Sequence, residues 1–65
     1  MFSLKSLNVL LVDDNQNMRA IASAVLHSAD IRNVYEASEG ATAFDLLRRH
    51  AIDLAIVDFL SLIHI

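Results

Sequence analysis

Three aspartates directly follow two short apolar runs, and they are the residues of this sequence best suited to chemistry. Asp13 and Asp14 come after the run 9–12, and Asp58 comes after the run 54–57. Carboxylates that lie close together repel one another, and a divalent cation that prefers oxygen, such as Mg²⁺, relieves that repulsion. A carboxylate beside Mg²⁺ is also a nucleophile toward phosphorus, and the product is an aspartyl phosphate.

The two apolar runs predict strands at the centre of a sheet. Residues 9–12 read VLLV and residues 54–57 read LAIV, without the alternation of apolar and polar residues that a half-buried strand shows. Unbroken runs of this kind are typical of strands covered on both faces, as in a parallel sheet. Each run therefore places its aspartates at the carboxyl end of a strand.

The segment after the first aspartate pair predicts a helix. Its apolar residues recur at i, i+3, i+4, i+7, i+8 and i+11, which is the spacing of one helical face. Either Asp14 or Asn15 can cap the start of this helix, because a side-chain oxygen accepts hydrogen bonds from its first N–H groups. The apolar positions are Met18, Ile21, Ala22, Val25, Leu26 and Ala29.

A second strand and a second helix follow in the same order. Residues 33–37, NVYEA, predict a short strand, and Ser38 or Glu39 leads into a helix over 40–50. The residues expected to point inward from this helix are Ala43, Phe44, Leu47 and Ala51.

The resulting β-α-β-α-β order predicts an α/β fold with a three-stranded parallel sheet. Crossovers between parallel strands are right-handed, so helices that cover opposite faces require the strand order 2-1-3. In such a sheet the ligand site lies beyond the carboxyl ends of the strands, where the strand order reverses. We therefore expect Asp13, Asp14 and Asp58 to converge there. A single acid at a strand end is usually a cap or turn former, and it is the combination that points to a site.

Composition excludes several other classes of protein. The chain has 65 residues, 55% of them hydrophobic, with a net charge of −3 and no cysteine. A domain of this size buries only about 60% of its unfolded surface, so its core has little in reserve. The few Lys and Arg residues do not form the clustered basic face that is typical of nucleic-acid binding. No segment is long enough to span a membrane. The N-terminal apolar run ends in two carboxylates, unlike a signal peptide, so we expect a cytoplasmic protein.

Three motifs resemble the receiver domain of two-component response regulators. They are VLLVDDNQNMR, EASEGATAFDLL and DLAIVD, and together they extend from about Asn8 to Phe59. The second motif has the pattern Ala-x-x-Gly-x-x-Ala, here Ala37, Gly40 and Ala43. The order 2-1-3 belongs to the fold of this family as well, so it is not independent of the resemblance.

The resemblance implies a flavodoxin-like signalling module rather than an enzyme. Asp58 would accept a phosphoryl group from a phosphohistidine on a sensor histidine kinase or phosphotransfer protein. Asp13, Asp14 and Asp58, with the backbone carbonyl of Leu60, would hold Mg²⁺. His27, His50 and His64 have no role in this scheme, and we expect the first two at the surface or at helix ends.

The sequence also departs from the family pattern. Receivers have five strands and five helices, with a Met-Pro step after the phosphoacceptor, a Thr or Ser after strand four and a Lys after strand five. Here FLSLIHI follows Val57 and Asp58, the only lysine is Lys5, and Ser61 is too close to Asp58 to replace the hydroxyl. Efficient phosphotransfer is therefore expected to be impaired.

We interpret residues 1–59 as a truncated receiver domain and residues 60–65 as an atypical apolar tail. The tail is either an artefact of the coding sequence or a genuine strand extension. The exposed edge of the third strand predicts self-association.

Other functions fit less well. A haloacid-dehalogenase-type phosphatase requires Asp-x-Asp after its first strand, where this chain has Asp13-Asp14-Asn15. A Rossmann nucleotide site requires a glycine-rich loop, and Gly40 is the only glycine. A fragment that lacks activity or needs a partner chain to fold is the remaining alternative, and it is compatible with the receiver interpretation.

Overall fold

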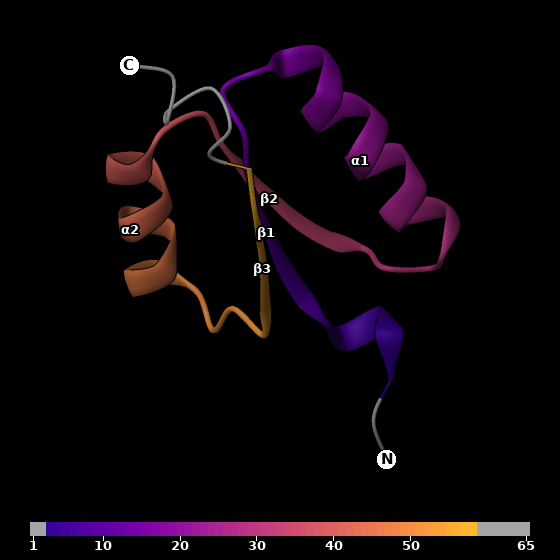
Figure 1. The fold of residues 1–65 in the computed structure, drawn as a ribbon. Coiled ribbons are helices and arrows are strands. Elements are labelled where there is room, and N and C mark those ends of the chain that lie inside the picture. Colours follow the sequence, from indigo (N-terminus) through magenta and orange to yellow (C-terminus); the bar gives the residue numbers. More distant parts are fainter. Residues whose placement is uncertain (1–2, 59–65) are drawn as a thin grey trace.

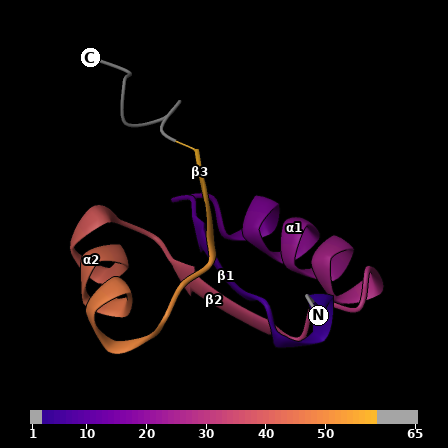
Figure 2. The ribbon, with the colours of Figure 1, turned by 90° about the horizontal axis from the view of Figure 1, so that it is seen from below.

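The computed structural model, which describes residues 3–58, has the predicted α/β fold. The elements are the short 3-10 helix η1 (Leu4–Ser6), β1 (Asn8–Val12), α1 (Gln16–Ser28), β2 (Asn33–Ala37), α2 (Gly40–Arg49) and β3 (Leu54–Val57). The three strands form one parallel sheet in the order β2-β1-β3. The helices α1 and α2 lie on opposite sides of this sheet (Figures 1 and 2). The predicted fold class and strand order are confirmed.

The central strand β1 forms the core of the molecule. Its residues from Val9 to Val12 are all buried, and Leu10 is only 1% exposed. Successive side chains of a strand point to opposite faces. Leu10 and Val12 therefore belong to one buried cluster, which includes Ala43 of α2, whereas Leu11 contributes to a pocket on the side of α1. The unbroken apolar run is thus explained by burial on both faces.

The start of α1 is fixed by a side-chain cap. The side-chain oxygen of Asn15 accepts a hydrogen bond from the backbone N–H of Met18, at 3.1 Å. Of the two residues that could cap this helix by sequence, Asn15 is the one that does so.

Asn15→Ala is expected to lower the free energy of unfolding by about 1 kcal/mol, because it leaves an N–H group of the first turn without its acceptor. Asn15→Ser is the matched control, since a serine hydroxyl still accepts the bond and should restore most of the loss. Urea denaturation followed by circular dichroism measures both. Equal losses in the two variants would show that the cap contributes little.

The turn after α1 requires an unusual backbone conformation. Asp30 has a φ of 72°, in the left-handed region, which aspartate adopts more readily than most residues other than glycine. The side chain of Asp30 is paired with Lys5 at 3.7 Å and with Arg32 at 3.9 Å. The turn directs the chain into Ile31, which is buried, and then into β2.

The strands β1 and β3 are joined at their amino ends by a pair of polar residues. The backbone N–H of Asn8 donates to the Asp53 carboxylate, and the N–H of Asp53 donates to the carbonyl of Asn8, both at 2.8 Å. The Asn8 side-chain amide also donates to the carbonyl of Ala51, at 2.9 Å. These bonds set the register in which Val9 lies opposite Leu54.

Three of the residues expected to point inward from the second helix are exposed, and Ala51 lies beyond the end of the helix. Phe44 is 69% exposed, and Leu47 and Ala51 are exposed as well. Only Ala43 is buried, and α2 ends at Arg49 rather than at residue 50. Phe44 and Leu47 line an apolar groove of about 130 Å³ beside Val57. They do face the sheet side, but nothing within residues 3–58 covers them.

The third strand is also more exposed than its sequence predicts. All four residues of β3 are exposed, although the run LAIV resembles that of β1. The reason is its place at the edge of the sheet, where it pairs only with β1 among the described strands. None of the helices within residues 3–58 has the length and apolar character needed to cross a bilayer.

Candidate functional site at the strand ends

Asp13 is held at the carboxyl end of β1 by its backbone and its side chain. Its N–H donates to the carbonyl of Ala37 at 3.1 Å, which continues the β1–β2 ladder by one residue. Its carboxylate oxygen Oδ1 accepts from the N–H of Asn15 at 2.9 Å. The side chain is half-buried. Asp13 thus ends the strand and also shapes the turn that leads into α1.

Asp58 occupies the equivalent place after β3. Its N–H donates to the carbonyl of Val12 at 2.9 Å, which extends the β1–β3 ladder. Because both ladders run in parallel, the two aspartates leave the sheet at the same edge. Asp13 and Asp58 line one small pocket of about 40 Å³, together with Leu11, Val12, Met18, Arg19, Ala22 and Ile56.

The third predicted carboxylate does not join this pair. Asp14 is exposed and is not among the residues that line the pocket. Across residues 3–58, no three His, Cys, Asp or Glu side chains lie close enough to form a metal-binding group. The structure therefore brings together two of the three carboxylates. The predicted carbonyl ligand, Leu60, lies outside the described residues.

A pair of carboxylates is nevertheless a suitable donor set for Mg²⁺. This ion usually keeps several waters and is held by one or two carboxylates together with phosphate oxygens. Asp13 and Asp58 supply two carboxylates at one pocket, with Asp14 adjoining in the chain. The residues present thus fit Mg²⁺ better than they fit a cation that needs a complete protein cage.

The sequence interpretation overlooked Arg19, which lies beside the two aspartates. It comes from the first turns of α1 and lines the same pocket. Its guanidinium donates to the backbone carbonyl of Asp13, and its Nε lies 3.3 Å from Oε1 of Glu36 on β2. A signal was present in the sequence, because a cation in the first turn of the helix after β1 must lie near the end of that strand.

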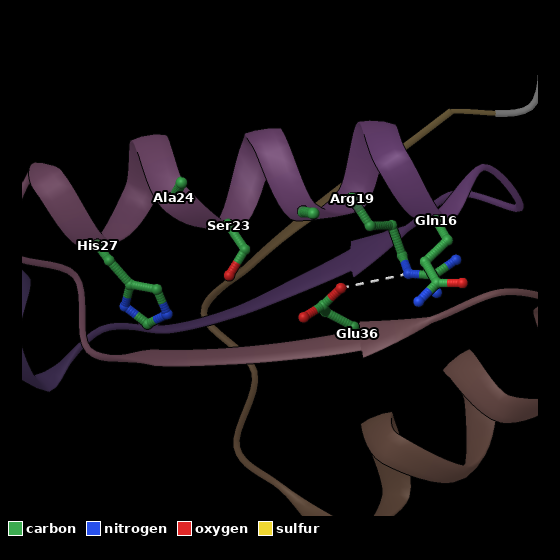
Figure 3. Close-up of a pocket in the computed structure, with 7 residues that line it drawn as sticks. Gln16, Arg19, Ser23, Ala24, His27 and Glu36 are labelled. Carbon is green, nitrogen blue, oxygen red and sulfur yellow. Dashed lines mark hydrogen bonds and ion pairs between the residues drawn. The ribbon is translucent and has the colours of Figure 1, made fainter.

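A much wider depression of the described surface lies elsewhere, between α1 and β2 (Figure 3). It has a volume of about 650 Å³ and is wide open to solvent. Gln16, Ser23 and His27 extend from α1 toward β2, and Glu36 extends from β2 toward α1 (Figure 3). This surface contains neither Asp13 nor Asp58, and only Arg19 belongs to both places.

The histidines within the described residues have structural contacts. A ring nitrogen of His27, in the last turn of α1, lies 3.0 Å from the carbonyl of Ile31. His50, directly after α2, stacks on Tyr35 with 4.2 Å between the ring centroids. Both lie at helix ends, as predicted, and His64 lies outside the described residues.

Comparison with known proteins identifies the family. The response regulator receiver domain family matches residues 9–60, which is most of the chain and includes all three aspartates. The chain belongs to this family. The receiver motif Ala37-x-x-Gly40-x-x-Ala43 has a packing role here, since Ala37 and Ala43 are buried in one cluster with Leu10.

Two curated relatives show the same similarity. They are the chemotaxis proteins CheY-3 of two Vibrio cholerae serotype O1 strains, Classical Ogawa 395 and El Tor Inaba N16961. Each is 33% identical to this receiver chain over 55 residues. The match covers 85% of the chain but only 42% of each relative. No solved structure gives a significant match.

Proposed function

We propose that this chain is a phosphoacceptor module of a two-component signalling system, with Asp58 as the acceptor. The observation that carries the proposal is the shared pocket of Asp13 and Asp58 at the carboxyl ends of two adjacent parallel strands. Membership of the receiver family supports it, because that family is a signalling module rather than a group of classical enzymes. The haloacid-dehalogenase alternative has no such support.

The proposed reaction is a phosphoryl transfer. A carboxylate oxygen of Asp58 attacks the phosphorus of a phosphohistidine on a sensor histidine kinase or phosphotransfer protein. An oxygen–phosphorus bond forms as the nitrogen–phosphorus bond breaks, and the departing imidazole nitrogen takes up a proton. The backbone bond from Asp58 to Val12 fixes the acceptor at the strand end, so that little reorganisation precedes the attack.

Asp13, Asp14 and Asp58, with the carbonyl of Leu60, would hold Mg²⁺. The bound ion supplies positive charge that offsets the repulsion between these carboxylates and an anionic phosphoryl group. Asp13 and Asp14 would orient the acceptor through this shared charge. A kinase partner that uses nucleotide also implies a cytoplasmic location for the reaction.

The Lys and the Thr or Ser that receivers use beside the phosphoryl group are not identified among these 65 residues, whose only lysine is Lys5. We retain 1–59 as the proposed bounds of the receiver segment and 60–65 as a separate tail. The tail lies outside the described residues.

The test is phosphoryl uptake from acetyl phosphate, which needs no partner protein. Intact-mass spectrometry should show a single phosphoryl group when Mg²⁺ is present and none when EDTA is added. Peptide mapping should place it on Asp58, as an acyl phosphate that alkali removes. Uptake that does not depend on Mg²⁺, or uptake on another residue, would overturn the proposal, as would a complete lack of uptake by folded protein.

A further inference from the structure

Arg19 is the one cation within residues 3–58 that lines the pocket of Asp13 and Asp58. Its side chain is only 16% exposed, in contrast to Lys5, Arg32, Arg48 and Arg49, whose side chains are all more than half exposed. A long charged side chain is rarely so well buried unless it is paired. The role of Arg19 therefore depends on the groups with which its guanidinium is paired.

The guanidinium makes two bonds in different directions. It donates to the backbone carbonyl of Asp13 on the side of the pocket, and its Nε pairs with the Glu36 carboxylate at 3.3 Å on β2. Figure 3 shows the second of these bonds, with Arg19 reaching down from α1 to β2. A planar guanidinium holds two acceptors in a fixed geometry, whereas the donors of an ammonium group rotate on a flexible stem.

These bonds complete the restraint of Asp13. Its N–H is bound to Ala37, its carboxylate to the N–H of Asn15, and its carbonyl to Arg19. Arg19 is in turn joined to Asn15 by a backbone bond of 3.0 Å. The short turn between β1 and α1, which contains Asp14, is therefore closed at both ends by groups that Arg19 contacts.

We propose that Arg19 is a positioning residue for the acidic pocket, which fixes the turn between β1 and α1 so that the Asp13 carboxylate stays in the pocket beside Asp58, where a cation would bind. This inference rests on the proposed function, because it assigns Arg19 a role in the same site. Groups that orient metal ligands through hydrogen bonds typically change metal affinity by about 10- to 100-fold when they are removed.

The sign of the effect separates positioning from simple electrostatics. Arg19 carries a positive charge close to a site for a cation. If its charge were all that mattered, Arg19→Met would remove repulsion and strengthen Mg²⁺ binding. If Arg19 fixes the turn, the same change weakens binding despite the lost repulsion. Arg19→Lys keeps the charge but lacks the rigid planar fork that holds both acceptors in place, so it should also bind Mg²⁺ less tightly than the wild type.

The experiment is a titration of the full 65-residue chain with MgCl₂, read from the amide signals of Asp13, Asp14 and Asp58 in ¹H–¹⁵N NMR spectra. Arg19→Met should raise the apparent Kd by about 10-fold or more, and Arg19→Lys should raise it in the same direction. Arg48→Met is the matched control, because it removes an exposed arginine of α2 that does not line the pocket, so its apparent Kd should equal that of the wild type.

The outcomes distinguish the two proposals. If the wild type does not bind Mg²⁺, the proposed function is overturned. If the wild type binds Mg²⁺ and Arg19→Met binds it equally tightly or more tightly, only the role of Arg19 is overturned. Circular dichroism confirms that each variant is folded. If Arg19→Met is unfolded, Arg19→Lys decides, since an affinity equal to that of the wild type contradicts positioning.

Discussion

Asp58→Asn is expected to abolish phosphoryl uptake from acetyl phosphate. An amide has nearly the shape of a carboxylate but is not a nucleophile toward phosphorus, so the variant keeps the fold and loses the reacting oxygen. Loss of a catalytic nucleophile lowers rates elsewhere by a factor on the order of 10⁴ or more, which here means no detectable product. The same variant should bind Mg²⁺ more weakly, because it removes one of the two carboxylates that line the pocket.

Asp45→Asn is the matched control for this variant. Asp45 lies on α2, where its carboxylate pairs with Arg48 at 3.6 Å and with Arg49 at 3.1 Å, and it does not line the acidic pocket. Intact-mass spectrometry should find its uptake equal to that of the wild type. Comparable uptake by Asp58→Asn and the wild type would show that the acceptor is another residue.

Leu10→Ala is expected to remove most of the stability of the fold. Leu10 is 1% exposed at the centre of β1 and packs in the cluster with Val12, Ala37 and Ala43. Truncation of a buried leucine costs about 2–5 kcal/mol, from lost burial and from the cavity it leaves. A chain of this length has only about 3–10 kcal/mol to lose at typical stabilities per residue. Much of the population should therefore unfold at 25 °C.

Leu4→Ala makes the same chemical change at an exposed site. Leu4 lies in η1 and is 46% exposed, so its truncation should cost less than about 1 kcal/mol. Urea denaturation followed by circular dichroism compares the two variants directly. Equal midpoints would mean that the cluster around Leu10 is not what holds the sheet together.

The parts of the fold that sequence predicts well are those with local physical causes. The run 9–12 predicts a strand covered on both faces, and β1 is such a strand. The helical spacing from Met18 to Ala29 predicts α1, and Asn15 caps it because its side chain needs only a neighbouring N–H group. Right-handed crossovers give the order β2-β1-β3 only if the two helices cover opposite faces, and the resemblance to the receiver family supplied that condition.

Burial at the edge of the sheet could not be read in the same way. Helical spacing shows that Phe44 and Leu47 share a face, but it does not show what covers that face. The run LAIV has the composition of a central strand, yet within residues 3–58 the strand β3 pairs with one neighbour and its residues are exposed. The composition of a segment indicates the kind of surface it can pack against, but it does not identify the segment that provides that surface.

The acidic site was predictable in outline and not in detail. Parallel strands must end at one edge, which places Asp13 and Asp58 near one another. The orientation of Asp14 depends on the turn that follows, and adjacent residues in a turn do not share a direction. The position of Arg19 near the end of β1 could be inferred from the sequence, but its bond to Glu36 could not, because Glu36 is distant in sequence and is brought close only by the pairing of β1 with β2.

The pairing of the strands also implies an order of assembly. The strand β1 joins β2 through partners such as Asn8 and Asn33, but it joins β3 through Val9 and Leu54, which are much farther apart in the chain. A longer loop costs more entropy to close, and β3 gains less burial when it arrives. The half of the sheet that bears Asp13 is therefore expected to form first, and the acidic pocket to be complete only once β3 has docked and brought Asp58 to it. On this expectation, folding of the last strand and completion of the site are one event.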